Sequence, residues 1–207
     1  MAAILLNLRN TIILGVILAI IMMFAYAKVS PHGLDDVTFW QAVFRWMHVL
    51  FGILWIGLLY YFNFVQTRMM PDIPAEQRPA IIKHIAPEAM FWFRWSALFT
   101  VLAGICVAAL RGHDYAAKVF SFGFAGGYGP DDRGFTLMGI GVWLAIIMFL
   151  NVWGVIWPAQ KIVLGIKEAD ADAKAKAGRI GTLASRTNVL LSLPMLTSMA
   201  MYQTLYG

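Results

Sequence analysis

The stretch RWMHVLFGILWIG, residues 45–57, places an arginine and a histidine inside an apolar run that is otherwise almost free of charge. The run extends from about residue 38 to residue 65. As a helix, a run of this length crosses the roughly 30 Å hydrocarbon core of a bilayer, and a helix satisfies its backbone hydrogen bonds without water. The stretch therefore predicts a membrane-spanning helix. Its ionisable side chains are candidates for function because they are costly to place in lipid.

The composition of the whole chain also indicates a membrane protein. Of its 207 residues, 60% are hydrophobic and 13% are charged, and the mean hydropathy is +0.71. A soluble domain is about half apolar and about a quarter charged. The net charge of +5 comes from basic residues in short loops between apolar runs. In this position, basic residues are expected to set the orientation of the chain in the membrane and to contact anionic lipid, rather than to bind nucleic acid. The single cysteine, Cys106, excludes an internal disulfide and a CxxCH site for covalent haem.

Five apolar stretches are long enough to cross a membrane, since about 20 helical residues are needed. We expect an all-α protein, a five-transmembrane-helix bundle that forms a single membrane domain over residues 1–207. The first stretch is interpreted as a retained anchor rather than a cleaved signal peptide. The predicted spans are approximately 11–27, 38–65, 90–110, 136–158 and 187–205.

Basic residues are distributed unequally between the loops on the two sides of the predicted spans. Ten lie on the side of the N-terminus and four on the opposite side. Positively charged loops stay in the cytoplasm, so we expect a cytoplasmic N-terminus and a periplasmic C-terminus in a multi-pass protein of the bacterial inner membrane. The ten are Arg9, Arg68, Arg78, Lys83, Lys161, Lys167, Lys174, Lys176, Arg179 and Arg186, and the four are Lys28, Arg111, Lys118 and Arg133.

Several polar segments have a predictable local structure. Three prolines in residues 69–80 predict a stiff connection rather than a helix. Alternating alanine and charge in residues 167–179 suit a solvated or membrane-surface helix. Ser185 is a candidate cap for the fifth span, and Pro194 is expected to kink that span.

One face of the second span has the features of a haem-binding surface. Arg45, His48, Gly52 and Trp55 follow helical spacing and share this face. A b-type haem needs a histidine ligand, a small neighbour that leaves room for a flat ring, and a cation for its propionate, and these roles fit His48, Gly52 and Arg45. The alternative is that the histidine bonds a neighbouring helix without any cofactor.

The second axial ligand is left open by the sequence. His113 is expected at the outer end of the third span. Met195 and Met199 in the fifth span are expected at depths closer to that of His48. A five-coordinate haem is a further alternative. Asn151 and Asn188, which also lie in predicted spans, are interpreted as contacts between helices.

Four motifs together resemble the membrane domain of the bacterial membrane-bound urate oxidase (urate hydroxylase) family. They occur in the family's order from about residue 40 to the C-terminus. The tryptophan–histidine–glycine helix is also similar, more weakly, to the membrane protoporphyrinogen oxidases. The motifs are RWMHVLFGILWIG (45–57), APEAMFWFRW (86–95), NVWGVIWPAQKIVLG (151–165) and SRTNVLLSLPML (185–196).

This resemblance implies a redox function. Members of the family carry a C-terminal c-type cytochrome domain and are assigned urate oxidation coupled to electron transport. The present sequence has no CxxCH motif, and it has Arg94, Trp95 and Ser96 where the family would lead us to expect a basic–Trp–acidic triplet. The cytochrome domain is therefore absent from this sequence, and the resemblance alone does not establish urate oxidation.

The first functional hypothesis is an electron-transfer protein or subunit that binds haem b and acts as a component of a membrane oxidoreductase. Its expected partners are membrane lipids, other membrane subunits or a c-type cytochrome. The alternative is a cofactor-free accessory or structural subunit of a larger membrane complex. A transporter or small-molecule enzyme using Arg45, Asn151 and Asn188 ranks below both because the sequence lacks inverted repeats. The substrate is not predicted.

Overall fold

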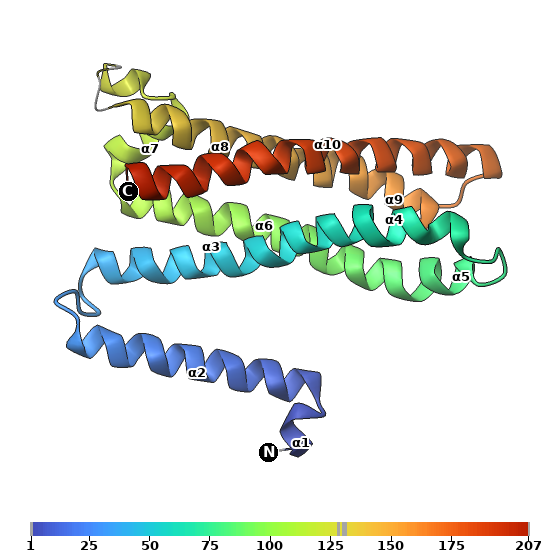
Figure 1. Ribbon diagram of the computed structural model, residues 1–207, viewed down its shortest axis with the longest axis horizontal. Coiled ribbons are helices and arrows are strands. Elements are labelled where there is room, and N and C mark those ends of the chain that lie inside the picture. The colour runs from blue at the N-terminus through green and yellow to red at the C-terminus, as the bar shows by residue number, and fades with distance from the viewer. Residues whose placement is uncertain (1, 128, 130–131, 207) are drawn as a thin grey trace.

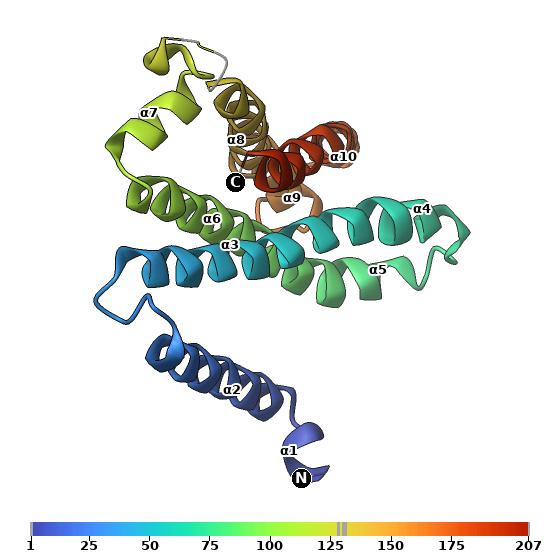
Figure 2. The ribbon, with the colours of Figure 1, turned by 60° about the vertical axis from the view of Figure 1, so that its left-hand side comes forward.

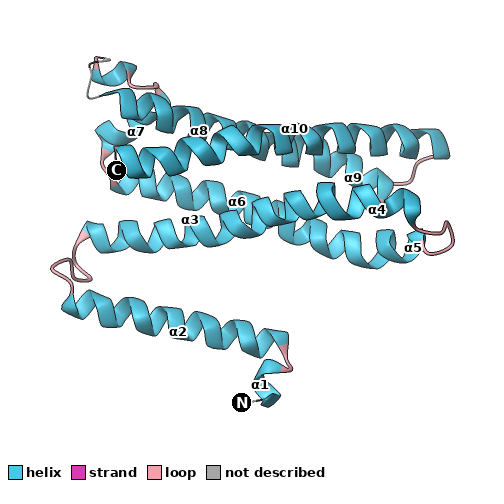
Figure 3. Cartoon of the chain, viewed as in Figure 1, coloured by secondary structure: helices cyan, strands magenta, loops and turns pink. Residues whose placement is uncertain are grey.

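The structure is a computed structural model that describes residues 2–127, 129 and 132–206. These residues form helices joined by short loops and contain no β-strand (Figure 3). The predicted all-α class is confirmed. In chain order, the helices are α1 (Ala2–Leu5), α2 (Leu8–Val29), α3 (Val37–Tyr60), η1 (Tyr61–Gln66), α4 (Thr67–Met69), η2 (Met70–Asp72), α5 (Arg78–Ala80), η3 (Ile81–Ile85), α6 (Ala86–Leu110), α7 (His113–Phe120), η4 (Phe124–Gly126), α8 (Arg133–Asn151), η6 (Val152–Ile156), α9 (Trp157–Val163) and α10 (Ala171–Leu205).

Four continuous helical segments are long and apolar enough to cross a membrane, and they contain the first four predicted spans. The segments extend beyond those spans because polar residues at their ends are helical as well. The connection predicted over residues 69–80 is correspondingly shorter: its ends are the helical turns η2 and α5, each with a proline in the first turn, where proline is tolerated. The four segments are Leu8–Val29, Val37–Asp72, Arg78–Leu110 and Arg133–Val163.

The last predicted surface helix and the fifth predicted span form one continuous helix, α10. The carboxylate of Asp170 caps it by accepting a hydrogen bond of 2.7 Å from the backbone N–H of Ala173. The prediction of a cap at Ser185 is wrong because this residue lies within the helix, which also continues through Pro194. Polar residues lower the hydropathy of α10, and it is not among the four candidate spans of the described chain.

The long helices lie side by side in an elongated bundle (Figure 1). The most extensive pairings are α3 with α6 and α8 with α10. The α4–α5 connection and the start of α10 lie at one end of the bundle, which we call the basic end because Arg68, Arg78 and Lys167 lie there. The start of α3, the end of α6 and the C-terminal end of α10 lie at the opposite end.

Helix α2 stands apart from this bundle in both orientations (Figures 1 and 2). Ala27 is its one buried residue, and its extensive contacts are confined to α1. The bundle itself is therefore built by α3 and the helices that follow it.

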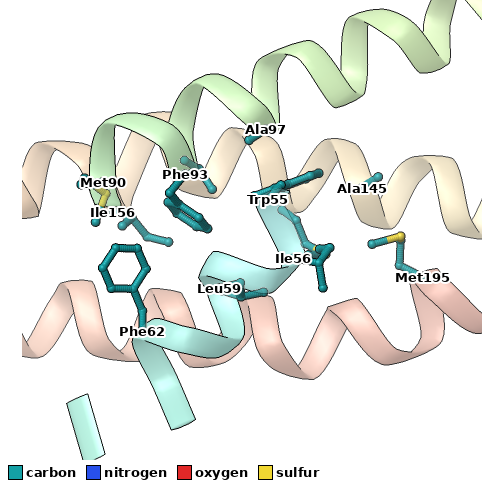
Figure 4. Packing of buried hydrophobic residues seen from close by; sticks show 12 residues of the cluster. Trp55, Ile56, Leu59, Phe62, Met90, Phe93, Ala97, Ala145, Ile156 and Met195 are labelled. Atoms are coloured by element: carbon teal, nitrogen blue, oxygen red, sulfur yellow. The ribbon is translucent and has the colours of Figure 1, made fainter. Parts of the chain in front are cut away.

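The hydrophobic core lies where α3, α6, α8 and α10 meet (Figure 4). Trp55, Leu59 and Phe93 are its largest members with almost no exposed surface, and the rings of Phe62 and Phe93 meet edge to face at 5.6 Å between centroids. The cluster comprises Trp55, Ile56, Leu59, Phe62, Met90, Phe93, Ala97, Ala145, Met148, Val152, Ile156 and Met195.

Three of the four candidate spanning segments contain a π-helical stretch in the half nearer the basic end. These are η1 after α3, η3 before α6 and η6 after α8. In a π-helix the backbone bonds run between residues i and i+5, so the turn is wider than in an α-helix.

The loop before α3 contains a capping carboxylate with an altered acidity. Asp36 Oδ1 accepts a hydrogen bond of 2.8 Å from the Thr38 backbone N–H, and its Oδ2 lies 2.6 Å from His32 Nδ1. The Thr38 hydrogen bonds, together with that from His32, lower the pKa of Asp36 to about 2.

We predict that Asp36→Ala lowers the thermal stability at neutral pH because α3 loses its cap. The folded-state pKa is below the unfolded one, so the stabilisation by Asp36 is present above pH 4 and is lost as the pH falls toward 2. Melting temperatures of both proteins in micelles across this range measure the effect. The difference between them should shrink with acidification, and a constant difference would contradict the assignment.

The close approach of α8 to α7 gives a second stability prediction. A methyl group on Gly139 would lie 2.5 Å from the carbonyl oxygen of Val119, whereas one on Gly154 would meet nothing within 4 Å. Gly139→Ala should therefore destabilise the fold by about 1–3 kcal/mol through overpacking. Gly154→Ala is the matched control and should be neutral or stabilising by up to about 1 kcal/mol. Equal unfolding free energies of the two variants would refute this packing.

Candidate functional site

A cavity of about 640 Å³ opens in the half of the bundle away from the basic end. Residues of α3, α6, α7, α8 and α10 line it, and most of them are apolar. Its volume lies within the range of small-molecule and cofactor sites, about 300–1,000 Å³. The four residues predicted to form one functional face all line the cavity: Arg45, His48, Gly52 and Trp55.

His48 is held in place by a backbone group of the neighbouring helix. Its Nδ1 lies 2.8 Å from the carbonyl oxygen of Thr100. A carbonyl oxygen only accepts, so Nδ1 must carry the proton and donate. Among the described residues, the other ring nitrogen, Nε2, has no hydrogen-bond partner. This is the arrangement by which proteins fix the tautomer of a histidine that ligates a metal.

The close contact between His48 and α6 depends on a glycine. A methyl group on Gly104 would lie 3.0 Å from Nδ1 and 3.1 Å from Cε1 of His48, so the ring rests directly against the backbone of α6. Thr100 is itself fixed, because its hydroxyl donates to the carbonyl oxygen of Ser96 at 2.7 Å. Sequence analysis missed Thr100 and Gly104, which reach the site only through the pairing of α3 with α6.

Two arginines from different helices lie at the cavity. Arg45 of α3 forms no hydrogen bond or ion pair with the described residues. Arg111, next to the end of α6, donates a hydrogen bond of 3.2 Å to the hydroxyl of Tyr115, and its guanidinium carbon lies 5.0 Å from the centre of that ring. The sequence places Arg111 in a loop without a specific role. The cavity therefore carries two cations, and no Asp or Glu is among its described lining residues.

Trp55 adds an unpaired donor to the wall of the cavity. Its side chain is 1% exposed, and its Nε1–H has no hydrogen-bond partner among the described groups. Buried donors without a partner cost free energy. A ligand with an acceptor atom would relieve this cost.

The three predicted second ligands are not equivalent in the structure. Met195 and Met199 line the cavity, and Met195 is also buried in the core. They lie about 15 Å and 9 Å from the end of α10, and His48 lies about 16 Å from the start of α3, at the same end of the bundle. His113 is exposed at the start of α7 and does not line the cavity.

The polar residues predicted as helix contacts do connect helices. Asn151 Nδ2 donates to Asn188 Oδ1 at 2.7 Å and to the Ala184 carbonyl oxygen at 2.8 Å. Asn188 Nδ2 donates to the carbonyl oxygen of Met148 at 3.1 Å. All of these bonds join α8 to α10, which accounts for both amides as packing groups.

The described part of the chain contains no group of three or more His, Cys, Asp and Glu residues arranged to hold a metal ion. A metal bound inside a porphyrin needs no such group, because the macrocycle supplies four ligands and the protein one or two.

The site belongs to an all-helical protein with candidate membrane spans and a deep apolar cavity. In comparison with known families, the model described as "Urate oxidase N-terminal" matches residues 131–207. This match supports a relationship to urate oxidases over the part of the chain that contains α8 and α10. It includes two of the four resembling motifs, while His48 and APEAMFWFRW lie outside it. No curated protein and no solved structure matches the chain.

The hydrogen bond from His48 to Thr100 predicts a single tautomer. In labelled protein, the ¹⁵N chemical shifts of the His48 ring should show a protonated Nδ1 and an unprotonated Nε2. Gly104→Val should abolish this preference by displacing the ring from the Thr100 carbonyl, while Gly57→Val, where a methyl group would meet nothing within 4 Å, should preserve it. A wild-type ring protonated at Nε2 would contradict the geometry.

Proposed function

We propose that this protein is an integral membrane electron-transfer protein or subunit that binds one b-type haem, with His48 as an axial ligand of the iron. The observation that carries the proposal is the placement of His48. Its Nδ1 is fixed by a backbone carbonyl, its other nitrogen has no partner in the described chain, and it lines an apolar cavity of about 640 Å³. Bound haem supplies one-electron redox chemistry, and the protein supplies the ligand and the environment.

The residues of the cavity fit the parts of a haem. Apolar side chains from five helices suit the porphyrin faces. Arg45, without a partner among the described residues, and Arg111 are the cations that would bind the propionates, because a guanidinium pairs well with a carboxylate. Met195 and Met199 are the residues that would offer a second ligand, since both line the cavity and His113 does not.

We further propose that residues 187–205 complete a fifth crossing. The buried face of this part of α10 is polar and includes Asn188, Ser192 and Ser198, while Leu190 and Leu193 are exposed. The polar residues therefore face the bundle and the apolar ones face outward, as expected for a helix that contacts lipid on one side. The excess of basic residues at the basic end supports a cytoplasmic N-terminus and a periplasmic C-terminus in a bacterial inner membrane.

In this orientation a haem held by His48 would lie in the periplasmic half of the membrane. A natural acceptor is a c-type cytochrome outside the membrane, as the family resemblance also suggests, and the donor is a membrane or substrate reductant. Urate oxidation is not included in the proposal, because the sequence has Ser96 in place of the acidic residue expected after Arg94 and Trp95 and has no CxxCH motif.

An absorption spectrum tests the proposal. Protein purified from cells supplied with haem should show a Soret band that shifts on reduction with dithionite, and His48→Ala should lose this band. His113→Ala is the matched control and should retain it, because His113 is exposed outside the cavity. Met195→Ala or Met199→Ala should change the band position if that sulfur ligates the iron. A folded, colourless wild-type protein would overturn the proposal.

The second candidate function is a cofactor-free subunit of a larger membrane complex. The observation that favours it is α2, an apolar helix with one buried residue that stands apart from the bundle. The same spectrum separates the two functions, since a folded colourless protein that co-purifies with other membrane subunits supports the second.

A further inference from the structure

A second cluster of polar groups lies around Arg94, in the half of the bundle nearer the basic end. Its guanidinium carbon lies 3.8 Å from the ring centre of Trp157, 5.8 Å from that of Trp153 and 5.9 Å from that of Phe91. Arg94 Nε is buried without a hydrogen-bond partner, and the described chain offers this side chain no ion pair. A guanidinium in a membrane span needs an anion or water, and the described chain supplies no anion to Arg94.

The neighbouring groups are also donors without partners. The Nε1–H groups of Trp95 and Trp153 are buried and unpaired in the described chain, and the two rings meet edge to face at 5.6 Å between centroids. Indole and guanidinium nitrogens donate and do not accept. A complementary ligand must therefore present acceptor oxygens.

A second cation lies against the same aromatic ring. Lys161, near the end of α9, has its Nζ 5.9 Å from the ring centre of Trp157, so this ring is shared by Lys161 and Arg94. The acid preceding Arg94 on the same helix, Glu88, accepts a hydrogen bond from Trp92 Nε1 at 2.9 Å and does not neutralise the pair. The cluster therefore carries two positive charges.

The position of the cluster suits the headgroup of a lipid. Glu88 lies in the first turn of α6, and Arg94 lies about 9 Å further along this helix. The long side chain of Arg94 can therefore reach the polar end of the bundle at which Glu88 and Lys161 lie. Phe91, Trp92 and Val155 beside the cluster are exposed, which leaves this face open to surrounding lipid. Basic pockets between helices at the cytoplasmic surface recognise anionic headgroups.

We propose that Arg94, Trp157 and Lys161 form a binding site for the phosphate group of an anionic phospholipid. The planar guanidinium of Arg94, whose carbon lies 3.8 Å from the ring centre of Trp157, donates to two phosphate oxygens. Lys161 contributes a second charge nearer the membrane surface, and the indole N–H of Trp153 is a further donor. The site is separate from the cavity that contains His48, so it does not depend on haem binding.

Binding of phosphatidylglycerol, measured by native mass spectrometry and by melting temperature in micelles, tests the site. Added phosphatidylglycerol should raise the melting temperature of the wild type, whereas phosphatidylcholine should have a smaller effect. Arg94→Gln should weaken phosphatidylglycerol binding about tenfold, the change expected for loss of a charge-assisted hydrogen bond. Lys161→Gln should weaken it less. Lys174→Gln, which removes an exposed charge on α10, is the matched control and should bind as the wild type does.

The alternative outcomes are distinguishable. If Arg94→Gln does not fold, the comparison of phosphatidylglycerol binding between Lys161→Gln and its control Lys174→Gln decides the test. Equal stabilisation by phosphatidylcholine would overturn the selectivity for an anionic lipid. Equal stabilisation by inorganic phosphate would assign the site to free phosphate instead of lipid. Unchanged phosphatidylglycerol binding in Lys161→Gln and Arg94→Gln would refute the site altogether.

Discussion

Hydrogen bonds between neighbouring helices tie this bundle together, because a polar group buried among apolar side chains is costly without a partner, and this constraint shapes how the helices pack. His48 bonds the backbone of α6, Asn151 and Asn188 join α8 to α10, and the hydroxyl of Tyr60 lies 3.0 Å from that of Ser192. The last pair links the α3–α6 half of the bundle to the α8–α10 half. The apolar core in Figure 4 packs between the same helices.

The constraint also explains why α10 differs from the other long helices. Its buried face carries Asn188, Ser192 and Ser198, so a measure of mean hydropathy does not mark it as a candidate span. The hydroxyl of Ser198 bonds the carbonyl oxygen of Leu137. This bond joins α10 to α8 near the cavity, at the end of the bundle where both candidate methionines lie.

The sequence predicted what depends on local pattern. Apolar length predicted four of the helices, and helical spacing placed Arg45, His48, Gly52 and Trp55 on one face, which does line the cavity. The predicted positions of the helix ends were less accurate, because polar residues beyond the apolar runs are also helical. The cap predicted at Ser185 was wrong, since the alanine-rich segment before it continues into the same helix.

Contacts between distant parts of the chain were beyond the reach of sequence analysis. Thr100, Gly104 and Arg111 reach the cavity because α6 pairs with α3, and no spacing within one helix reveals that pairing. The cluster around Arg94 was missed for the same reason. Its tryptophans, Trp95, Trp153 and Trp157, come from α6, η6 and α9, which are far apart in the sequence.

The π-helical stretches η1, η3 and η6 divide three of the long helices into two parts with different rotational registers. One extra residue in a turn rotates all later side chains by about 100° around the axis relative to an uninterrupted α-helix. A face identified near His48 therefore cannot be extended by simple 3.6-residue counting past Tyr61. Each part of such a helix therefore presents a different set of side chains to its neighbours from the set that uninterrupted 3.6-residue spacing would give.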